Sequence, residues 1–168
     1  MTERPAYSDR RVIDRHLFVP HYLAVLANSL TWSQSLFYRE KYGIGVNEVR
    51  IVTVLAHSPG LTARGLSEAL VMNKAIVSKS LAILAKMALI EEDGASRPRP
   101  YFLTEAGVEL NARIVRVALE RERRLLDGFT ANDKTIVLGY LARMYHNLAT
   151  TVDLSLMAAD ARDEADDA

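Results

Sequence analysis

The chain has 168 residues, of which 49% are hydrophobic and 25% charged, as expected for one folded domain or a small domain with long accessory helices. Lysine and arginine balance aspartate and glutamate at 21 each, so net charge neither favours nor excludes a nucleic-acid partner. The absence of cysteine excludes disulfides, thiolate metal sites and cysteine-based redox sensing.

The N-terminal residues lack the apolar core of a signal peptide, and no apolar run reaches the roughly 20 residues that cross a membrane. We therefore expect a cytoplasmic protein without a membrane partner. Residues 1–15 are polar and contain Pro5, so they predict a flexible N-terminal arm. The acidic residues 158–168 predict a flexible tail at the other end.

A long amphipathic helix is predicted after the arm. Its apolar positions recur in steps of three and four from Leu23 to Phe37, as on one face of a helix. Pro20 suits the first helical turn, where its missing N–H is not needed, and Gly43 is placed to end the helix. The apolar stripe of this helix needs a partner, either from its own chain or from another.

Three shorter helices are predicted next. Asn47 is expected to cap the first, which runs to a break at Pro59. Because apolar residues cover most of its circumference, this helix should lie buried in the centre of the domain. Thr62 and Asn73 are natural N-caps for the second and third helices, and the link between them near Met72 is short, as in a helix-turn-helix.

The third of these helices, from Lys74 to Met87, has two unlike faces at about 100° per residue. The face that should dock on the preceding helices consists of Val77, Leu81, Leu84 and Ala88. The opposite face carries Lys74, Ala75, Ser78, Lys79 and Ala82. Two cations, a hydroxyl group and two small residues suit close approach to the major groove of DNA. Ile76 and Ile83 lie on the flank, where we favour packing over contact with a thymine methyl group.

A β-wing is predicted after this helix. Residues 88–92 and 101–103 are typical of short strands, and the segment between them turns at Asp93-Gly94. Arg97 and Arg99 would reach the DNA backbone or the minor groove from this wing. Taken alone, the segment would more simply be a solvated charged loop, but its place directly after a candidate recognition helix favours the wing.

Two long helices are predicted at the C-terminal end. Thr104 caps the first, whose main apolar positions are Leu110, Ile114, Val117 and Leu125. We interpret its basic residues Arg121, Arg123 and Arg124 as a solvated face. Thr130 and Asp133 form a capping-box start for the last helix, whose stripe consists of Val137, Leu141, Met144, Leu148 and Val152. Burial of such stripes across a two-fold axis is the simplest way to cover them.

In this order the motifs resemble those of the MarR family of winged-helix transcriptional regulators, over residues 18–148. The helix-turn-helix pattern is carried by Leu61-Thr62, Leu66, Leu70, Asn73-Lys74, Val77-Ser78-Lys79, Leu81, Leu84 and Leu89-Ile90. Residues 103–107, LTEAG, are similar to the LTxxG signature of the family, and Arg50 leads the apolar core of the second helix as in the family. The chain departs from the pattern at Ala95 in the wing, where an acid is usual, at Val49, often a tryptophan, and at Ala88, where a glycine is expected.

The resemblance implies a mainly α fold with a small β-wing, in which a winged helix-turn-helix at residues 46–104 stands between long N- and C-terminal dimerisation helices at residues 16–45 and 105–157. It also implies a homodimer that binds a pseudo-palindromic operator in double-stranded DNA. Such proteins typically repress transcription and are released by a small molecule, often a phenolic or aromatic acid. We expect DNA contacts from Thr62, Arg64, Lys74, Ala75, Ser78, Lys79, Ala82, Arg97 and Arg99, and no cofactor.

An effector pocket is hypothesised from Trp32, Tyr38 and His57. The simpler interpretation of His57, at the end of the second helix, is a satisfied structural histidine. The aromatic residues of the first helix likewise belong more often to a core than to a ligand site.

The alternative function is a winged-helix protein-interaction module that has lost specific DNA binding, which the altered wing and the zero net charge suggest. An enzyme is not expected, because no GxSxG or phosphate-loop glycine pattern appears. The four histidines also lack the spacing of metal ligands: His16, His21, His57 and His146.

Overall fold

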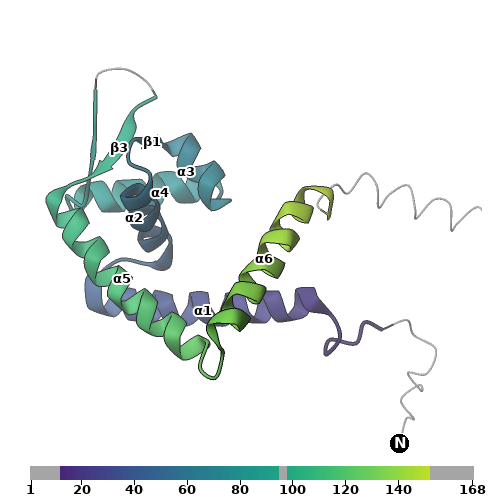
Figure 1. Cartoon of the computed structure of the whole chain (residues 1–168). Coiled ribbons are helices and arrows are strands. Elements are labelled where there is room, and N and C mark those ends of the chain that lie inside the picture. The colour runs from purple at the N-terminus through teal and green to yellow at the C-terminus, as the bar shows by residue number, and fades with distance from the viewer. Residues whose placement is uncertain (1–11, 95–97, 152–168) are drawn as a thin grey trace, which may run out of the picture. The chain divides into compact units, whose positions relative to one another are not determined.

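The computed structural model describes residues 12–94 and 98–151. The structure is mainly helical and also contains one small sheet, which confirms the predicted fold class (Figure 1). The elements in chain order are α1 (Val19–Tyr42), α2 (Val46–His57), β1 (Leu61–Thr62), α3 (Ala63–Leu70), α4 (Lys74–Lys86), β2 (Ile90–Glu92), β3 (Pro100–Leu103), α5 (Glu105–Leu125) and α6 (Ala131–Thr151). The chain divides into two compact units, residues 1–116 and 117–168, with the boundary inside α5. No helix in the described part of the chain is both long and apolar enough to cross a membrane.

Helix α1 begins at Val19, has Pro20 in its first turn and ends at Gly43, as predicted. Gly43 has a φ of 71°, and its N–H donates to the carbonyl oxygen of Arg39 at 3.0 Å. Glycine adopts this left-handed conformation without steric cost, so the helix ends at this residue.

The start of α2 differs from the prediction. Asn47, the expected N-cap, lies inside the helix, and the N-cap is Gly45. The Glu48 carboxylate accepts a hydrogen bond from the Gly45 N–H at 2.8 Å. An acid at the third helical position that bonds back to the N-cap amide starts a helix without a polar side chain at the cap itself.

The next two helices begin as predicted. The Thr62 hydroxyl oxygen accepts from the Gly65 N–H at 3.2 Å, and the Asn73 side-chain oxygen accepts from the Ala75 N–H at 2.8 Å. Each bond satisfies a backbone donor that a helix start leaves free, which stabilises a helix by about 1 kcal/mol. These caps place the starts of α3 and α4.

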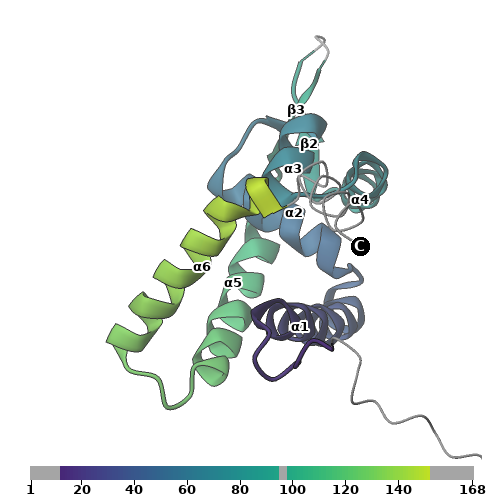
Figure 2. The same ribbon diagram turned by 90° about the vertical axis from the view of Figure 1, so that its right-hand side faces the viewer.

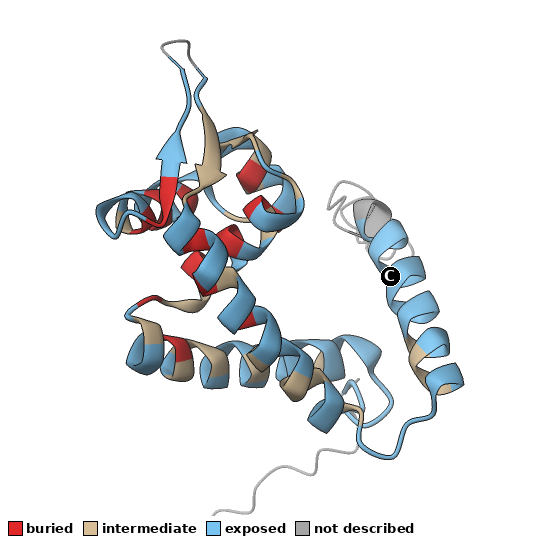
Figure 3. Cartoon of the chain, turned by 60° about the vertical axis from the view of Figure 1, so that its left-hand side comes forward, coloured by how far each residue is buried: buried red, intermediate tan, exposed pale blue. Residues whose placement is uncertain are grey.

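The core of the first unit is built around α2, and in Figure 3 the buried residues gather among the helices beside the small sheet. Its largest fully buried side chains are Tyr38, Ile44, Ile51, Val52, Leu55, Leu66, Val77, Leu84 and Ile114. Three of these belong to α2, which confirms that helix as the buried centre. Burying each side chain of this kind contributes roughly 1.5–3 kcal/mol, so the core holds α4 firmly against α2 and α3.

The three strands form one antiparallel sheet in the order β1–β3–β2, and Figure 2 labels the β2–β3 hairpin. Ile90 of β2 lies opposite Leu103, and Glu92 lies opposite Tyr101. On the other side of β3, Leu61 of β1 pairs with Tyr101. Strand β1 was not predicted, because two residues are too few to show the alternation of a strand.

Ala88 lies at the corner between α4 and β2, where the structure corrects two predictions. It was predicted both on the buried face of α4 and as the first residue of the wing strand, but it is exposed, belongs to neither element and has a φ of 52°. Its N–H donates to the carbonyl oxygen of Ala85 at 2.9 Å, and the Leu89 N–H donates to that of Leu84 at 3.0 Å. These two bonds form a Schellman cap, whose left-handed residue turns the chain out of the helix.

The start of α5 is bonded to this same corner. The Thr104 hydroxyl donates to the carbonyl oxygen of Ala88 at 2.7 Å and accepts from the Gly107 N–H at 3.2 Å. A Cβ atom on Gly107 would lie 2.1 Å from the carbonyl oxygen of Leu89, so only glycine fits there. The threonine and the glycine of the LTEAG segment thus join α5 to the base of the wing.

The second unit is described from residue 117 to residue 151, and it contains the end of α5 and the helix α6. The predicted capping box of α6 is confirmed: Asp133 accepts from the Thr130 N–H at 2.8 Å, and the Thr130 hydroxyl oxygen accepts from the Asp133 N–H at 3.2 Å. Of the predicted apolar stripe, Leu141, Met144 and Leu148 are exposed in the single chain. Val152 and the predicted tail at 158–168 lie outside the described residues, as does most of the predicted arm.

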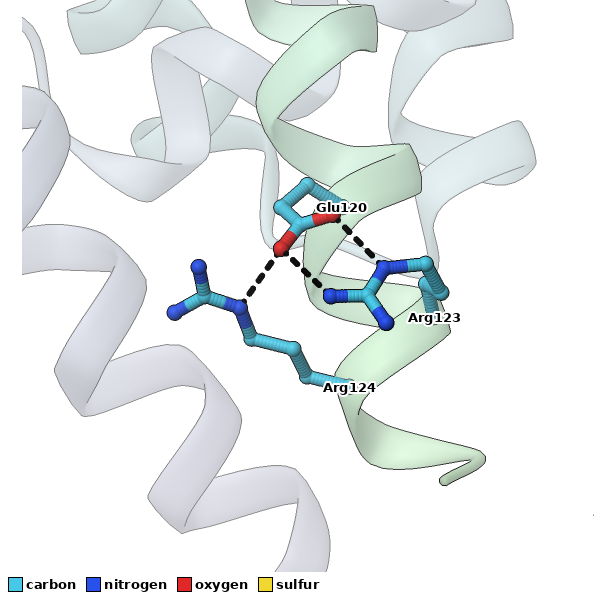
Figure 4. A network of polar contacts seen from close by, with 3 residues as sticks. All are labelled: Glu120, Arg123 and Arg124. Carbon is cyan, nitrogen blue, oxygen red and sulfur yellow. Dashed lines mark hydrogen bonds and ion pairs between the residues drawn. The ribbon is translucent and has the colours of Figure 1, made fainter. Parts of the chain in front are cut away.

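The basic end of α5 forms a small ionic network (Figure 4). Arg123 donates from two nitrogens to the two oxygens of Glu120, each at 2.9 Å, and Arg124 donates to Glu120 at 2.7 Å. Both arginines are exposed, which confirms the solvated face for them, whereas Arg121 is half-buried. The hydrogen bonds from Arg123 and Arg124 lower the pKa of Glu120 to about 2.

Candidate nucleic-acid interface

Helices α3 and α4 meet through a short turn that is fixed by three contacts. The Met72 N–H donates to the carbonyl oxygen of Ser67 at 3.0 Å, and the Ser67 hydroxyl donates to the carbonyl oxygen of Met72. Arg50 of α2 donates from Nη2 to the carbonyl oxygen of Leu70 at 3.1 Å. Val71 lies between these contacts with a φ of 50°, which is rare for a β-branched residue. The turn is therefore held both by its own bonds and by α2, as a helix-turn-helix requires.

The face of α4 that was predicted to meet DNA is exposed. It consists of Lys74, Ala75, Ser78, Lys79 and Ala82. Val77, Leu81 and Leu84, on the opposite face, are buried. Neither Lys74 nor Lys79 forms an ion pair with any acid in the described part of the chain. Two uncompensated cations on a helix face with small neighbours are suited to contact with phosphate.

A polar contact beneath this face was not apparent from the sequence. Ser80, which is 2% exposed, donates from its hydroxyl to Oε1 of Glu48 at 2.5 Å. Glu48 is 7% exposed, and its other oxygen accepts from the Gly45 N–H. Helix α4 is therefore tied to the start of α2 by a buried carboxylate with donors on both oxygens.

The wing carries an ion pair between its two strands. Arg99 at the start of the β3 segment donates from Nη1 to Oε2 of Glu92 on β2 at 2.6 Å. The hydrogen bond with Glu92 raises the pKa of Arg99, and burial followed by a hydrogen bond with Glu92 raises the pKa of Tyr101. Glu92, Arg99 and Tyr101 thus form one polar cluster on the hairpin. Arg97, the other predicted wing residue, lies outside the described residues.

Thr62 and Arg64, the two remaining residues predicted to contact DNA, lie at the start of α3. Thr62 is half-buried, and its hydroxyl oxygen serves as the N-cap of the helix. Arg64 is exposed and forms an ion pair with Glu68 at 2.8 Å; the hydrogen bond in this pair raises the pKa of Arg64. Exposed ion pairs of this kind are weak, so this pair constrains the Arg64 side chain little.

A cavity of about 420 Å³ lies between the end of α1, the start of α2 and the flank of α4. We call it the α1–α2–α4 cavity. Its lining includes the cations Arg39 and Lys79, the buried pair Glu48 and Ser80, and the side chains of Ile76 and Ile83. Ile76 is 43% exposed, so the prediction that it packs is wrong, whereas Ile83 is half-buried. Lys79 therefore belongs both to the exposed face of α4 and to this cavity.

The three residues hypothesised to bind an effector do not form a common site in the chain. Tyr38 is 2% exposed, and Trp32 is 72% exposed. They lie six residues apart on α1, which places them about 120° apart around the helix. His57 is exposed at the end of α2 rather than buried. None of the three lines the α1–α2–α4 cavity.

Across residues 12–94 and 98–151, no group of three or more histidine, aspartate or glutamate side chains is arranged to hold a metal ion. The histidines of this part of the chain therefore do not combine with acids into such a site.

Comparison with known proteins agrees with this geometry. The family model of bacterial regulatory proteins of the arsR family matches residues 47–92, which span α2 to the first wing strand. The crystal structure of a MarR/EmrR family transcriptional regulator from Acinetobacter sp. ADP1 is 32% identical in sequence. That similarity covers 83% of this chain and 99% of the other, with a TM-score of 0.74. No match is found among curated proteins.

Two further solved structures share the fold at lower identity. A MarR protein from Peptoclostridium difficile DA00132 is 18% identical, with a TM-score of 0.75 over 88% of this chain and 97% of the other. MepR of S. aureus, solved in complex with DNA, is also 18% identical, with a TM-score of 0.69 over 79% of this chain and 98% of the other.

Proposed function

The chain belongs to the MarR/EmrR family of transcriptional regulators, and on that premise we propose that it is a homodimeric, sequence-specific repressor that a small organic effector releases from its operator. The family is one of transcriptional regulators and not of enzymes, in agreement with the prediction. The proposed binding to double-stranded DNA also favours the expected cytoplasmic location.

The observation that carries the proposal is the exposed face of α4. Lys74 and Lys79 would neutralise phosphate groups, and the hydroxyl of Ser78 would bond to a base edge or a phosphate. Ala75 and Ala82 are small enough to let the helix backbone enter the major groove. Thr62 and Arg64 would contact the DNA backbone at the start of α3, and Arg97 and Arg99 would do so from the wing.

Dimerisation is supported by exposed apolar faces on the long helices. In α1 the exposed side chains include Leu23 and Leu26, and in α6 they include Leu141, Met144 and Leu148. Apolar rows of this length are uncommon on the surface of a monomer, and a second copy of the chain would cover them. Residues 16–45 and 105–157 remain our proposed dimerisation region, and residues 46–104 the DNA-binding domain. Two-fold symmetry then predicts half-sites roughly 10 base pairs apart.

Selection of DNA sequences by the purified protein, followed by titration of the selected duplex, tests the proposal. Lys74→Ala and Lys79→Ala together should weaken binding and reduce the slope of log K against log salt by about two, one for each phosphate that is no longer neutralised. Lys41→Ala is the matched control, because it removes one cation from α1 outside the proposed face.

Two results would contradict the proposal. Undiminished affinity in the double variant would remove α4 as the recognition helix. If no selected sequence binds more tightly than random duplex, the chain is instead the winged-helix interaction module that has lost specific DNA binding.

A further inference from the structure

Ile76 stands out among the apolar residues of α4. Within this helix, all of which the structure describes, it is the one large apolar side chain that is exposed, at 43%. Val77, Leu81 and Leu84 are buried, and Ile83 is half-buried. A single exposed apolar residue is common on protein surfaces, so its place on the helix decides what it is able to contact.

Ile76 lies in the first turn of α4, as the third residue of the helix. In a helix-turn-helix, the N-terminal residues of the second helix are those that contact base edges in the major groove. Ile76 shares one side of the helix with Lys79 and Ile83, which follow it in steps of three and four. Of the two isoleucines, only the one near the N-terminus is exposed, so this apolar side opens to solvent at the end that would enter the groove.

The chemistry of an isoleucine side chain limits its partner in that groove. Lys74, Ser78 and Lys79 are able to hydrogen-bond to phosphates or base edges, whereas Ile76 has no donor and no acceptor on its side chain. The apolar group that the major groove presents is the C5-methyl group of thymine. Ala75, one position earlier, is small enough to let the helix approach the bases closely.

We propose that Ile76 packs against the C5-methyl group of one thymine in each half-site of the operator, and that this contact makes Ile76 a specificity-determining residue. The inference rests on the proposed function, in which α4 enters the major groove. It deepens that function by naming a base that the chain reads through an apolar contact and not through a hydrogen bond.

Replacement of thymine by uracil in the duplex selected by the wild-type protein tests the contact. Uracil pairs with adenine as thymine does and lacks only the methyl group. Thymines are replaced one position at a time, in both half-sites together, and binding is measured by fluorescence anisotropy. One position should weaken wild-type binding by about sixteenfold, since each buried methyl group is equivalent to about fourfold in the dissociation constant.

The variant Ile76→Ala identifies which thymine is involved. It should bind the thymine duplex more weakly than the wild type does, and it should no longer respond to uracil at the position concerned. This loss of sensitivity is the coupling that a double-mutant cycle measures between two groups in contact. Affinity for random duplex and the slope of log K against log salt should stay unchanged, because the substitution removes no charge.

Met87→Ala is the matched control. Met87 is 41% exposed, almost as much as Ile76, but it is the C-cap of α4, roughly 16 Å further along the helix axis. This variant should keep both the wild-type affinity and the wild-type response to uracil. Thermal denaturation of both variants checks that they fold, which we expect because both side chains are exposed and alanine favours helix.

The outcomes separate this inference from the proposed function. Specific binding without any uracil position coupled to Ile76 would overturn the thymine contact and leave the proposed function standing. A changed salt slope in Ile76→Ala would show a general disturbance of α4 and would also overturn the contact. If no selected sequence binds more tightly than random duplex, the proposed function and the thymine contact are both wrong.

Discussion

The carboxylate of Glu92 lies 2.6 Å from Nη1 of Arg99, between the two strands of the wing. The usual acid of the family is missing from this wing, where Ala95 stands two residues before Arg97. An acid on the opposite strand holds Arg99 instead, with Tyr101 bonded to the same carboxylate. The wing thus has an oriented arginine, although the local sequence pattern for one is absent.

We expect Glu92→Gln to reduce the ratio of specific to non-specific DNA affinity. Loss of the carboxylate frees Arg99 to sample many rotamers, while removal of a negative charge favours phosphate at any sequence. The measurement is fluorescence anisotropy with selected and random duplexes at one salt concentration. Glu91→Gln is the matched control, since Glu91 is the neighbouring exposed acid on β2 and has no ion pair to Arg99. Equal ratios in the two variants would show that the ion pair does not orient Arg99 for DNA.

We expect Ser80→Ala to lower the free energy of unfolding by about 1–3 kcal/mol, because it leaves the buried Glu48 carboxylate with one donor fewer. Urea denaturation followed by circular dichroism measures the change. Ser78→Ala on the exposed face of the same helix should change stability by less than about 0.5 kcal/mol. If Ser80→Ala lowers the free energy of unfolding by no more than Ser78→Ala does, water replaces the missing donor.

We expect Ala88→Gly to raise the free energy of unfolding by about 0.5–1 kcal/mol. A left-handed conformation costs a non-glycine residue roughly 1–2 kcal/mol, and the greater freedom of glycine in the unfolded chain offsets part of that gain. The same substitution at Ala85, inside α4 and exposed, should have the opposite sign and cost about 1 kcal/mol. Thermal denaturation of both variants distinguishes the two signs, and destabilisation by Ala88→Gly would contradict the strained cap.

The pKa of Glu120 should be about 2 in the folded chain, against an ordinary value of 4.5. Since the folded pKa is depressed, the stabilisation from this network is fully present above about pH 4.5 and is lost as the pH falls through about 2. Carboxyl carbon shifts in an NMR titration measure this pKa directly. Arg123→Gln should raise it more than Arg124→Gln, because Arg123 contributes the largest hydrogen-bond effect. An unperturbed Glu120 in the wild-type protein would exclude the network.

Features that depend on neighbours in sequence were predictable. The caps at Thr62 and Asn73 and the capping box at Thr130 and Asp133 each join residues within three positions of one another. The two faces of α4 follow from helical periodicity alone, and the structure confirms them, apart from Ala88.

Features that depend on distant residues were not predictable. Ser80 and Glu48 are 32 positions apart, and neither position reveals that the other will lie beside it. The left-handed Ala88 was missed because alanine ordinarily favours helix, and the structure of the wing corner overrides that preference. The grouping of Trp32 with Tyr38 is a different case: their separation of six residues already places them on different sides of α1.

Lys79 stands at the edge where the exposed face of α4 becomes the wall of the α1–α2–α4 cavity. A substitution at Lys79 alters both the exposed face of α4 and the wall of the cavity. Lys74, Ala75, Ser78 and Ala82 do not line the cavity. In the proposed function, a substitution at position 79 therefore alters operator preference and the shape of the cavity together. On the same proposal, evolution of the chain toward a new operator is freest at the other four positions.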